Sequence, residues 1–169
     1  MNNKLITGLL IVLLAGTIGY IASQRSGDDN KPAYTIDSKD TAAPATKDKT
    51  VDLSGQQLTA IPEDVLQQTD ITSLNLSNNQ LTSLPAEISQ FKNLTTLNVE
   101  NNRLETLPPE IGQLTKLKSA DFGNNRLQSL PSELGDLVQI RQLNLSGYKG
   151  SSADVDQLKA KLTGTEVKT

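Results

Sequence analysis

A repeat of 23 residues constrains the fold of this chain more strongly than any other feature of its sequence. The three full units read ITSLNLSNNQLTSLPAEISQFKN, LTTLNVENNRLETLPPEIGQLTK and LKSADFGNNRLQSLPSELGDLVQ. An earlier unit, VDLSGQQLTAIPEDVLQQTD, keeps the phase, and a partial fifth, IRQLNLSGYKG, begins in phase and then departs. A fixed period of this length is typical of a solenoid, in which each unit stacks on the next.

The spacing of apolar residues within a unit predicts a short strand. Leu74 and Leu76 are two residues apart, so both point to one side of a strand, while Asn75 and Ser77 point to the other. One unit cannot bury its leucines alone, whereas stacked units place them in one core behind a parallel sheet with strands about 4.8 Å apart. We therefore expect an α/β solenoid over residues 48–169, with four repeats and a partial fifth.

Polar residues and prolines recur at the same period. An asparagine follows each full-unit strand, at Asn79, Asn102 and Asn125. Its amide both donates and accepts, so we expect it to satisfy backbone groups of its own turn and of neighbouring turns rather than to bind a ligand. Each Leu-Pro pair is followed by an acid, and the residues are Pro85, Pro108, Pro131, Glu87, Glu110 and Glu133. Proline at the first position and a carboxylate in the first turn predict a short helix, with a calcium or partner site as the alternative use of the acids.

Both ends of a solenoid need a cap, because an open end exposes leucines. At the N-terminal end, polar Gln56 and Gln68 replace the turn asparagine and an apolar residue of later units. At the other end we expect a capping helix at about 152–163 and an edge strand at 165–167. The expected features of that helix are a capping box, an apolar face and a glycine stop, formed by Ser151 and Asp154, by Val155, Leu158 and Leu162, and by Gly164.

The pattern L-x-x-L-x-L-x-x-N-x-L-x-x-L-P-x-x-I/L, with other apolar residues at some leucine positions, is seen at 71–88, 94–111 and 117–134. Ala120 and Phe122 depart from the leucine pattern together, as one core volume exchanged for another. The pattern resembles the 23-residue leucine-rich repeats of bacterial surface and effector proteins, and also those of Ras-linked scaffold proteins. The resemblance implies a curved solenoid whose concave parallel sheet binds proteins or peptides. We therefore expect a protein-interaction module.

The first 47 residues differ in character from the repeats. Leu5 to Ala22 is an 18-residue run without charge, flanked by Lys4 and Arg25. As a helix it would be about 27 Å long, which suits a hydrocarbon core of ~30 Å. We expect residues 1–25 to be a single-pass membrane anchor, with a cleaved signal peptide and a secreted protein as the alternative. Residues 26–47, rich in Asp, Lys, Thr, Ala and Pro, predict a disordered linker, and we expect the repeats to be extracytoplasmic.

The composition restricts the chemistry that the chain can perform. The sequence has no histidine and no cysteine, so it has no imidazole base, thiolate nucleophile or usual zinc site. A net charge of -3, with no block of basic residues, does not indicate a nucleic-acid partner. We expect no enzyme activity and no cofactor. The remaining catalytic alternative is a hydrolase that uses Asp121 with Glu100 on the neighbouring strand.

The outward positions of the strands are the candidate binding residues. One column, formed by Asp52, Asn75, Asn98, Asp121 and Asn144, places one short polar side chain in each unit. The full candidate set is Asp52, Ser73, Asn75, Thr96, Asn98, Glu100, Lys118, Asp121, Arg141, Asn144 and Tyr148. We expect these residues to bind a protein, a peptide or a glycan that runs along the sheet, with modest affinity because aromatic anchors are scarce. The alternative is an envelope spacer without a specific ligand.

Overall fold

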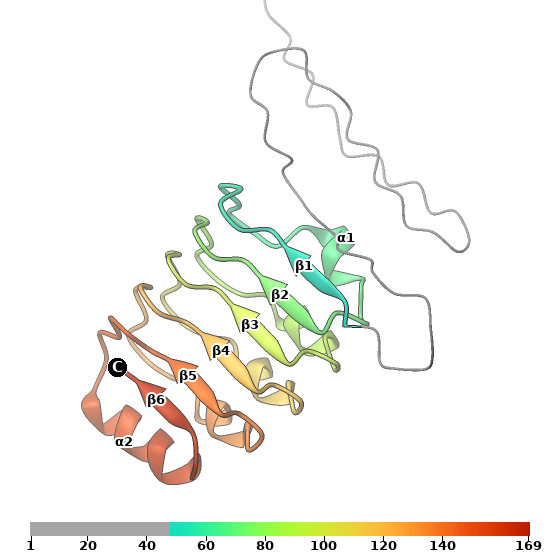
Figure 1. Cartoon of the computed structure of the whole chain (residues 1–169). Helices are drawn as coiled ribbons and strands as arrows, with labels where there is room; N and C mark the ends of the chain where they lie inside the picture. The colour runs from blue at the N-terminus through green and yellow to red at the C-terminus, as the bar shows by residue number, and fades with distance from the viewer. Residues whose placement is uncertain (1–47) are drawn as a thin grey trace, which may run out of the picture. The chain divides into compact units, whose positions relative to one another are not determined.

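The computed structural model describes residues 48–169, which form a six-stranded parallel sheet in the order β1 to β6 (Figure 1). The strands are β1 Thr50–Asp52, β2 Ser73–Asn75, β3 Thr96–Asn98, β4 Ser119–Asp121, β5 Gln142–Asn144 and β6 Glu166–Lys168. The predicted anchor at 1–25 and linker at 26–47 lie outside the described residues. Among residues 48–169, no helix has the length and apolar character needed to cross a membrane.

The register of the sheet follows the sequence repeat. Leu74 of β2 pairs with Leu97 of β3, 23 residues later, and the same step joins β1 to β2, β3 to β4 and β4 to β5. The last step is one residue longer, because Leu143 of β5 pairs with Val167 of β6. The predicted parallel solenoid sheet is therefore confirmed, and it includes the expected terminal edge strand.

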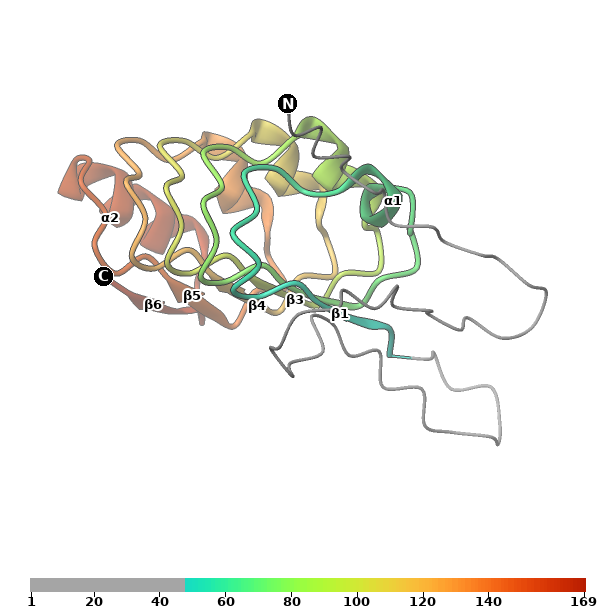
Figure 2. The ribbon, with the colours of Figure 1, turned by 90° about the horizontal axis from the view of Figure 1, so that it is seen from above.

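A row of short helices forms the layer opposite the sheet (Figure 2). These elements are α1 Glu63–Leu66, η1 Ala86–Gln90, η2 Pro109–Gln113, η3 Ser132–Asp136 and α2 Ser152–Lys161, where η denotes a 3₁₀ helix. The predicted position of the prolines was wrong by one residue. Pro85, Pro108 and Pro131 are the N-cap residues in extended conformation, and the helix begins at the following residue. The glutamates lie in the first turns, as predicted.

The core between the two layers is aliphatic apart from two phenylalanines. Phe91 and Phe122 are almost completely buried, together with the inward-facing apolar residues of β1 to β5. Ala120 stands where the neighbouring strands have Leu97 and Leu143, and it lies two residues from Phe122 in a buried position. A small and a large side chain thus replace two medium ones, which keeps the core volume similar.

The turn asparagines form a buried ladder, as predicted. Asn79, Asn102 and Asn125, here called the asparagine ladder, are 7 to 8% exposed. The Nδ2 of Asn102 donates to the carbonyls of Leu76 (2.9 Å) and Val99 (3.0 Å), and its Oδ1 accepts from the Leu81 amide (3.0 Å). Asn79 and Asn125 repeat this pattern one coil away on either side. Each asparagine therefore ties its own turn to the preceding coil.

The residue before each ladder position has a left-handed backbone. The φ angles are 68° at Gly55, 59° at Asn78, 57° at Asn101, 54° at Asn124 and 83° at Gly147. Asparagine and glycine tolerate this region better than other residues. The paired asparagines of each unit thus have different tasks, since the first makes the turn and the second satisfies buried backbone groups.

The C-terminal cap resembles the predicted one. Ser151 is the N-cap of α2, and its hydroxyl accepts from the Ala153 amide at 3.1 Å. The apolar face is buried as expected, at Val155, Leu158 and Leu162. The helix ends at Lys161 and is followed by Gly164 with a φ of 89°. The carboxylate expected to complete the capping box instead accepts a hydrogen bond from Tyr148.

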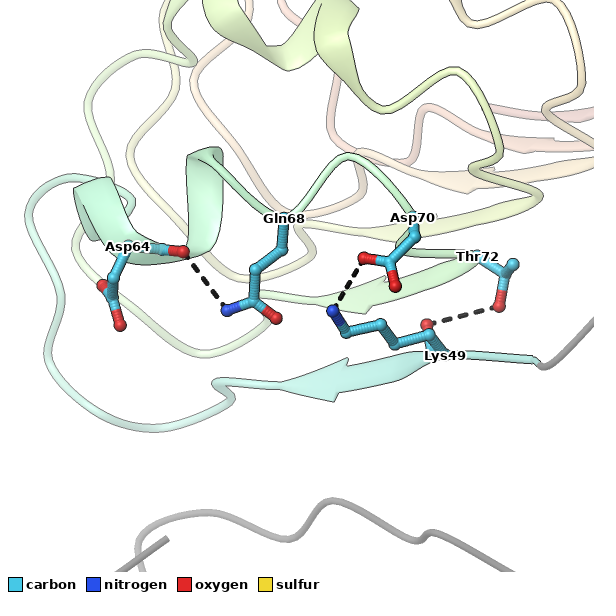
Figure 3. Close-up of polar contacts among 5 residues, drawn as sticks. All are labelled: Lys49, Asp64, Gln68, Asp70 and Thr72. Carbon is cyan, nitrogen blue, oxygen red and sulfur yellow. Dashed lines mark hydrogen bonds and ion pairs between the residues drawn. The ribbon is translucent and has the colours of Figure 1, made fainter. Parts of the chain in front are cut away.

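Polar contacts hold the N-terminal coil together (Figure 3). Lys49 Nζ lies 2.7 Å from Asp70 Oδ1, and the Lys49 carbonyl accepts from the Thr72 hydroxyl at 3.2 Å. The side chain of Gln68 donates to the carbonyl of Asp64 at 3.2 Å. In the first coil Gln68 thus bonds to the backbone of α1, whereas later coils have a buried apolar side chain at this position.

Candidate functional site

The side of the sheet that faces away from the core carries the predicted binding residues, and we call it the polar sheet face. The sheet register places the predicted column in one row, of which every member is half-buried: Asp52, Asn75, Asn98, Asp121 and Asn144. Lys168 of β6 extends this row beside Asn144. The sequence prediction missed Lys168, because it ended the edge strand one residue too early.

We call the row of Asp52, Asn75, Asn98, Asp121 and Asn144 the central row. It has a structural task that the sequence prediction also missed. In each member the side-chain Oδ1 accepts the backbone N–H two residues later, at 2.8 to 3.1 Å. Such a turn closes the end of the strand just before the left-handed residue. One acceptor of every side chain is therefore committed to the fold. The signal in the sequence was the repeated Asn or Asp placed three residues before Gly or Asn.

Asp121 is the most firmly held member of the row. Its Oδ1 accepts from the Gly123 amide at 2.8 Å, and both carboxylate oxygens accept from Asn144 Nδ2 at 3.0 Å. The lack of a side chain at Gly123 makes room for the Asn144 amide, since a Cβ at Gly123 would lie only 2.7 Å from Asn144 Nδ2. The row therefore contains one immobilised carboxylate between two amide side chains.

Two further rows lie next to the central one, both on the side where the strands begin. The first consists of four small hydroxyl side chains followed by one amide side chain in β5: Thr50, Ser73, Thr96, Ser119 and Gln142. The second row lies one residue earlier in each coil and consists of Thr72, Thr95, Lys118 and Arg141. In it the hydroxyl of Thr95 donates to the carbonyl of Thr72 at 2.9 Å. The same row brings two exposed cations together, because the Arg141 amide donates to the Lys118 carbonyl at 2.7 Å. The predicted residues Ser73 and Thr96 thus share one surface with the central row. The exposed Lys118 and Arg141 lie at the edge of this surface, directly before β4 and β5.

Glu100 lies at the margin of this face, where β3 ends. Its Oε1 accepts from Asn124 Nδ2 at 3.1 Å, so its side chain points along the coil stack. The alternative of a hydrolase would need Glu100 and Asp121 to face one bound substrate. Two hollows described by the structure lie instead on the helix side, between η2 and η3 and between η3 and α2. Each of the two carboxylates accepts from an amide side chain of the following coil, Glu100 from Asn124 and Asp121 from Asn144.

Tyr148 belongs to the C-terminal cap rather than to the polar sheet face. It takes the coil position of the asparagine ladder, packs against the core and donates its hydroxyl to Asp154 Oδ2 at 2.5 Å. Burial, this hydrogen bond and the negative charge of Asp154 raise the pKa of Tyr148 to about 12. Its hydroxyl is therefore engaged within the domain.

Comparisons with known proteins agree with this architecture. A family model described as a leucine-rich repeat region matches residues 50–164. A solved leucine-rich-repeat protein of Leptospira interrogans is 40% identical in sequence and superposes with a TM-score of 0.64. That match covers 67% of this chain and 29% of the Leptospira chain, so this chain spans less than a third of its relative. No curated protein matches. Because the family model covers well over half of the sequence, the chain belongs to the leucine-rich-repeat family.

Proposed function

We propose that the chain is a non-catalytic, membrane-tethered module that binds a protein or peptide on the polar sheet face. The observation that carries the proposal is the in-register array of polar side chains across five strands. The Oδ1 atoms of Asn75 and Asn98 each accept a hydrogen bond that closes the turn after their own strand. Within residues 48–169 their Nδ2 groups donate no hydrogen bond, so these groups can donate to a ligand. Membership in the leucine-rich-repeat family supports an interaction role.

The chemistry of the face indicates the kind of partner. Hydroxyls and amides recur at one step of about 4.8 Å per strand, which suits a chain that forms many hydrogen bonds across the sheet. The exposed Lys118 and Arg141 add positive charge where β4 and β5 begin, and the fixed Asp121 carboxylate lies at the other end of β4. Since interface affinity usually comes from buried Trp, Tyr or Arg anchors, we expect a modest affinity spread over many weak contacts. A glycan presents similar groups and is the second ligand class.

The membrane tether is the part of the proposal that rests on the sequence alone. The uncharged run from Leu5 to Ala22 has the length of a membrane span, and a short N-terminal head usually stays in the cytoplasm. The repeats would then lie outside the cytoplasm, held off the bilayer by residues 26–47. A protease added to cells with a sealed inner membrane tests this arrangement. Loss of a tag placed after Thr169 supports it, and protection of the tag until detergent is added contradicts it.

One other function is that of an envelope spacer without a ligand. It is favoured by the central row, because every Oδ1 atom there already accepts a backbone hydrogen bond of its own turn. Thr96→Arg separates the two functions, because it places a large side chain on an exposed position of β3 that has no turn role. Thr115→Arg, in the exposed loop after η2, is the matched control. Crosslinking in intact cells should recover a partner with the wild type and with Thr115→Arg, but not with Thr96→Arg. Recovery of no partner with any of the three proteins would favour the spacer. Equal recovery with all three would place the binding site away from the polar sheet face.

A further inference from the structure

A file of three positive side chains runs along the turns that follow the strands, at Arg103, Arg126 and Lys149, and we call it the basic ridge. Each residue directly follows the coil position of the asparagine ladder. The Arg126 amide donates to the Leu104 carbonyl at 2.8 Å, and the Lys149 amide donates to the Leu127 carbonyl at 2.9 Å. The ridge therefore advances by one coil per charge, which is about 4.8 Å in a parallel stack.

The charges of the basic ridge have no counter-ion in the described part of the chain. All three side chains are exposed, and the ion pair found within residues 48–169 joins Lys49 to Asp70 instead. Like charges one coil step apart repel each other, to an extent that solvent and salt reduce for exposed side chains. The free protein thus carries an unfavourable arrangement that a bound anion would relieve.

The acidic file on the helix side offers an instructive contrast. Glu87, Glu110 and Glu133 also occur once per coil, but each lies in the first turn of a 3₁₀ helix. A carboxylate there meets the positive end of the helix, so the fold itself explains these charges. The basic ridge lies on turns, and no comparable local interaction explains it.

We propose that the basic ridge binds a short acidic segment of a partner protein in extended conformation. Three charges separated by two coil steps span about 10 Å, and an extended chain advances about 3.3 Å per residue. A run of three or four Asp or Glu residues therefore has the matching length. The two arginines suit carboxylates, because a guanidinium can form two parallel hydrogen bonds with one carboxylate.

The surroundings of the ridge favour a short acidic segment over a long polyanion. The file ends in neutral Gln80 on one side, and Asp154 follows Lys149 on the other as α2 begins. Two acids, Glu100 and Glu105, also lie close in sequence to Arg103. A nucleic acid or polyphosphate would extend beyond the ridge into these groups. The site is separate from the polar sheet face, and it does not rest on the function proposed above.

The experiment measures binding of a labelled peptide with four consecutive glutamates between Gly-Ser flanks. The full-length chain, kept in a non-ionic detergent at low salt, is titrated against the peptide by fluorescence anisotropy. The ridge variant carries Arg103→Gln, Arg126→Gln and Lys149→Gln. The control variant carries Lys92→Gln, Lys116→Gln and Lys159→Gln, which removes the same charge from exposed positions elsewhere. We expect at least tenfold weaker binding for the ridge variant and less than a twofold change for the control.

Several results would overturn the proposal. Equal weakening in both variants would indicate a general charge effect, and equal binding of a four-glutamine peptide would exclude recognition of carboxylates. Tighter, ridge-dependent binding of polyphosphate would indicate a different ligand class. A charge-reversed variant with glutamate at all three positions should instead bind a four-lysine peptide. Thr96→Arg should leave peptide binding unchanged, so failure at the ridge is distinguishable from failure at the polar sheet face.

Discussion

The side-chain amide of Asn144 donates to both carboxylate oxygens of Asp121, at 3.0 Å each, across the junction of β4 and β5. The Oδ1 atoms of both residues also close the turn at the end of their own strand. One pair of side chains thus ends two strands and joins them. A position that faces solvent and looks ready for a ligand therefore also contributes to the stability of the fold.

This double task leads to a prediction for Asp121. Asp121→Asn keeps an Oδ1 acceptor for the Gly123 amide, so we expect it to lower the free energy of unfolding by less than about 1 kcal/mol. Asp121→Ala leaves that amide and the Asn144 side chain without their partner and should cost about 1 to 2 kcal/mol. Urea unfolding followed by circular dichroism measures both. Asp156→Ala, on the exposed face of α2, is the control, and a loss of similar size there would contradict the argument.

The two asparagines of one unit should respond very differently to substitution. Asn102→Ala leaves the buried Leu81 amide without its acceptor, whereas the carbonyls of Leu76 and Val99 each keep a bond from the neighbouring ladder asparagine. We therefore expect a loss of about 1 to 3 kcal/mol. Asn101→Gly keeps the left-handed turn and should change the unfolding free energy by less than about 1 kcal/mol. Thermal unfolding of the two variants tests the contrast. Similar midpoints would show that the ladder contributes little.

The sheet register and the asparagine ladder were predictable because the spacing of apolar residues in the sequence determines which side chains are buried. Leu74 and Leu97 have to meet in one core once 23 residues separate them, and the polar residue that turns inward after the strand has to bond the backbone. The committed Oδ1 atoms of the central row were not predictable in this way. An outward Asn98 has the same spacing whether its oxygen closes a turn or remains free, and only the local backbone decides. The C-terminal cap was unpredictable for the same reason. The sequence position of Asp154 is compatible both with a capping box and with a hydrogen bond from Tyr148, and the structure has the second.

Tyr148 should make stability depend on pH at the alkaline end. Its pKa is raised from 10.0 to about 12 in the folded chain, so folding favours the protonated phenol. The contribution is complete below pH 10 and is lost as the pH rises from about 10 to 12. The tyrosinate absorbance of the wild type minus that of Tyr148→Phe should therefore titrate with a midpoint near 12. A midpoint near 10 would mean that the bond to Asp154 does not persist in solution.

Two glycines on the helix side should differ in their tolerance of a methyl group. A Cβ at Gly112 would lie 2.5 Å from the carbonyl oxygen of Glu133 and 2.8 Å from its Cβ, so η2 and η3 would have to separate. At Gly135 the nearest atom is Cδ of Lys161, 2.5 Å away, which belongs to a flexible and exposed side chain. We expect Gly112→Ala to lower the free energy of unfolding by about 1 to 3 kcal/mol, the usual cost of overpacking.

Gly135→Ala should be close to neutral, because Lys161 can move and alanine loses less backbone entropy on folding than glycine. Its remaining cost is the bond from Lys161 Nζ to the Ser132 carbonyl, a long contact of 3.3 Å at the surface. Unfolding midpoints of the two single variants and of the double variant provide the measurement. A loss at Gly135 as large as that at Gly112 would show that α2 is packed as rigidly against η3 as the repeats are against one another, and that the C-terminal cap behaves as a further coil of the solenoid.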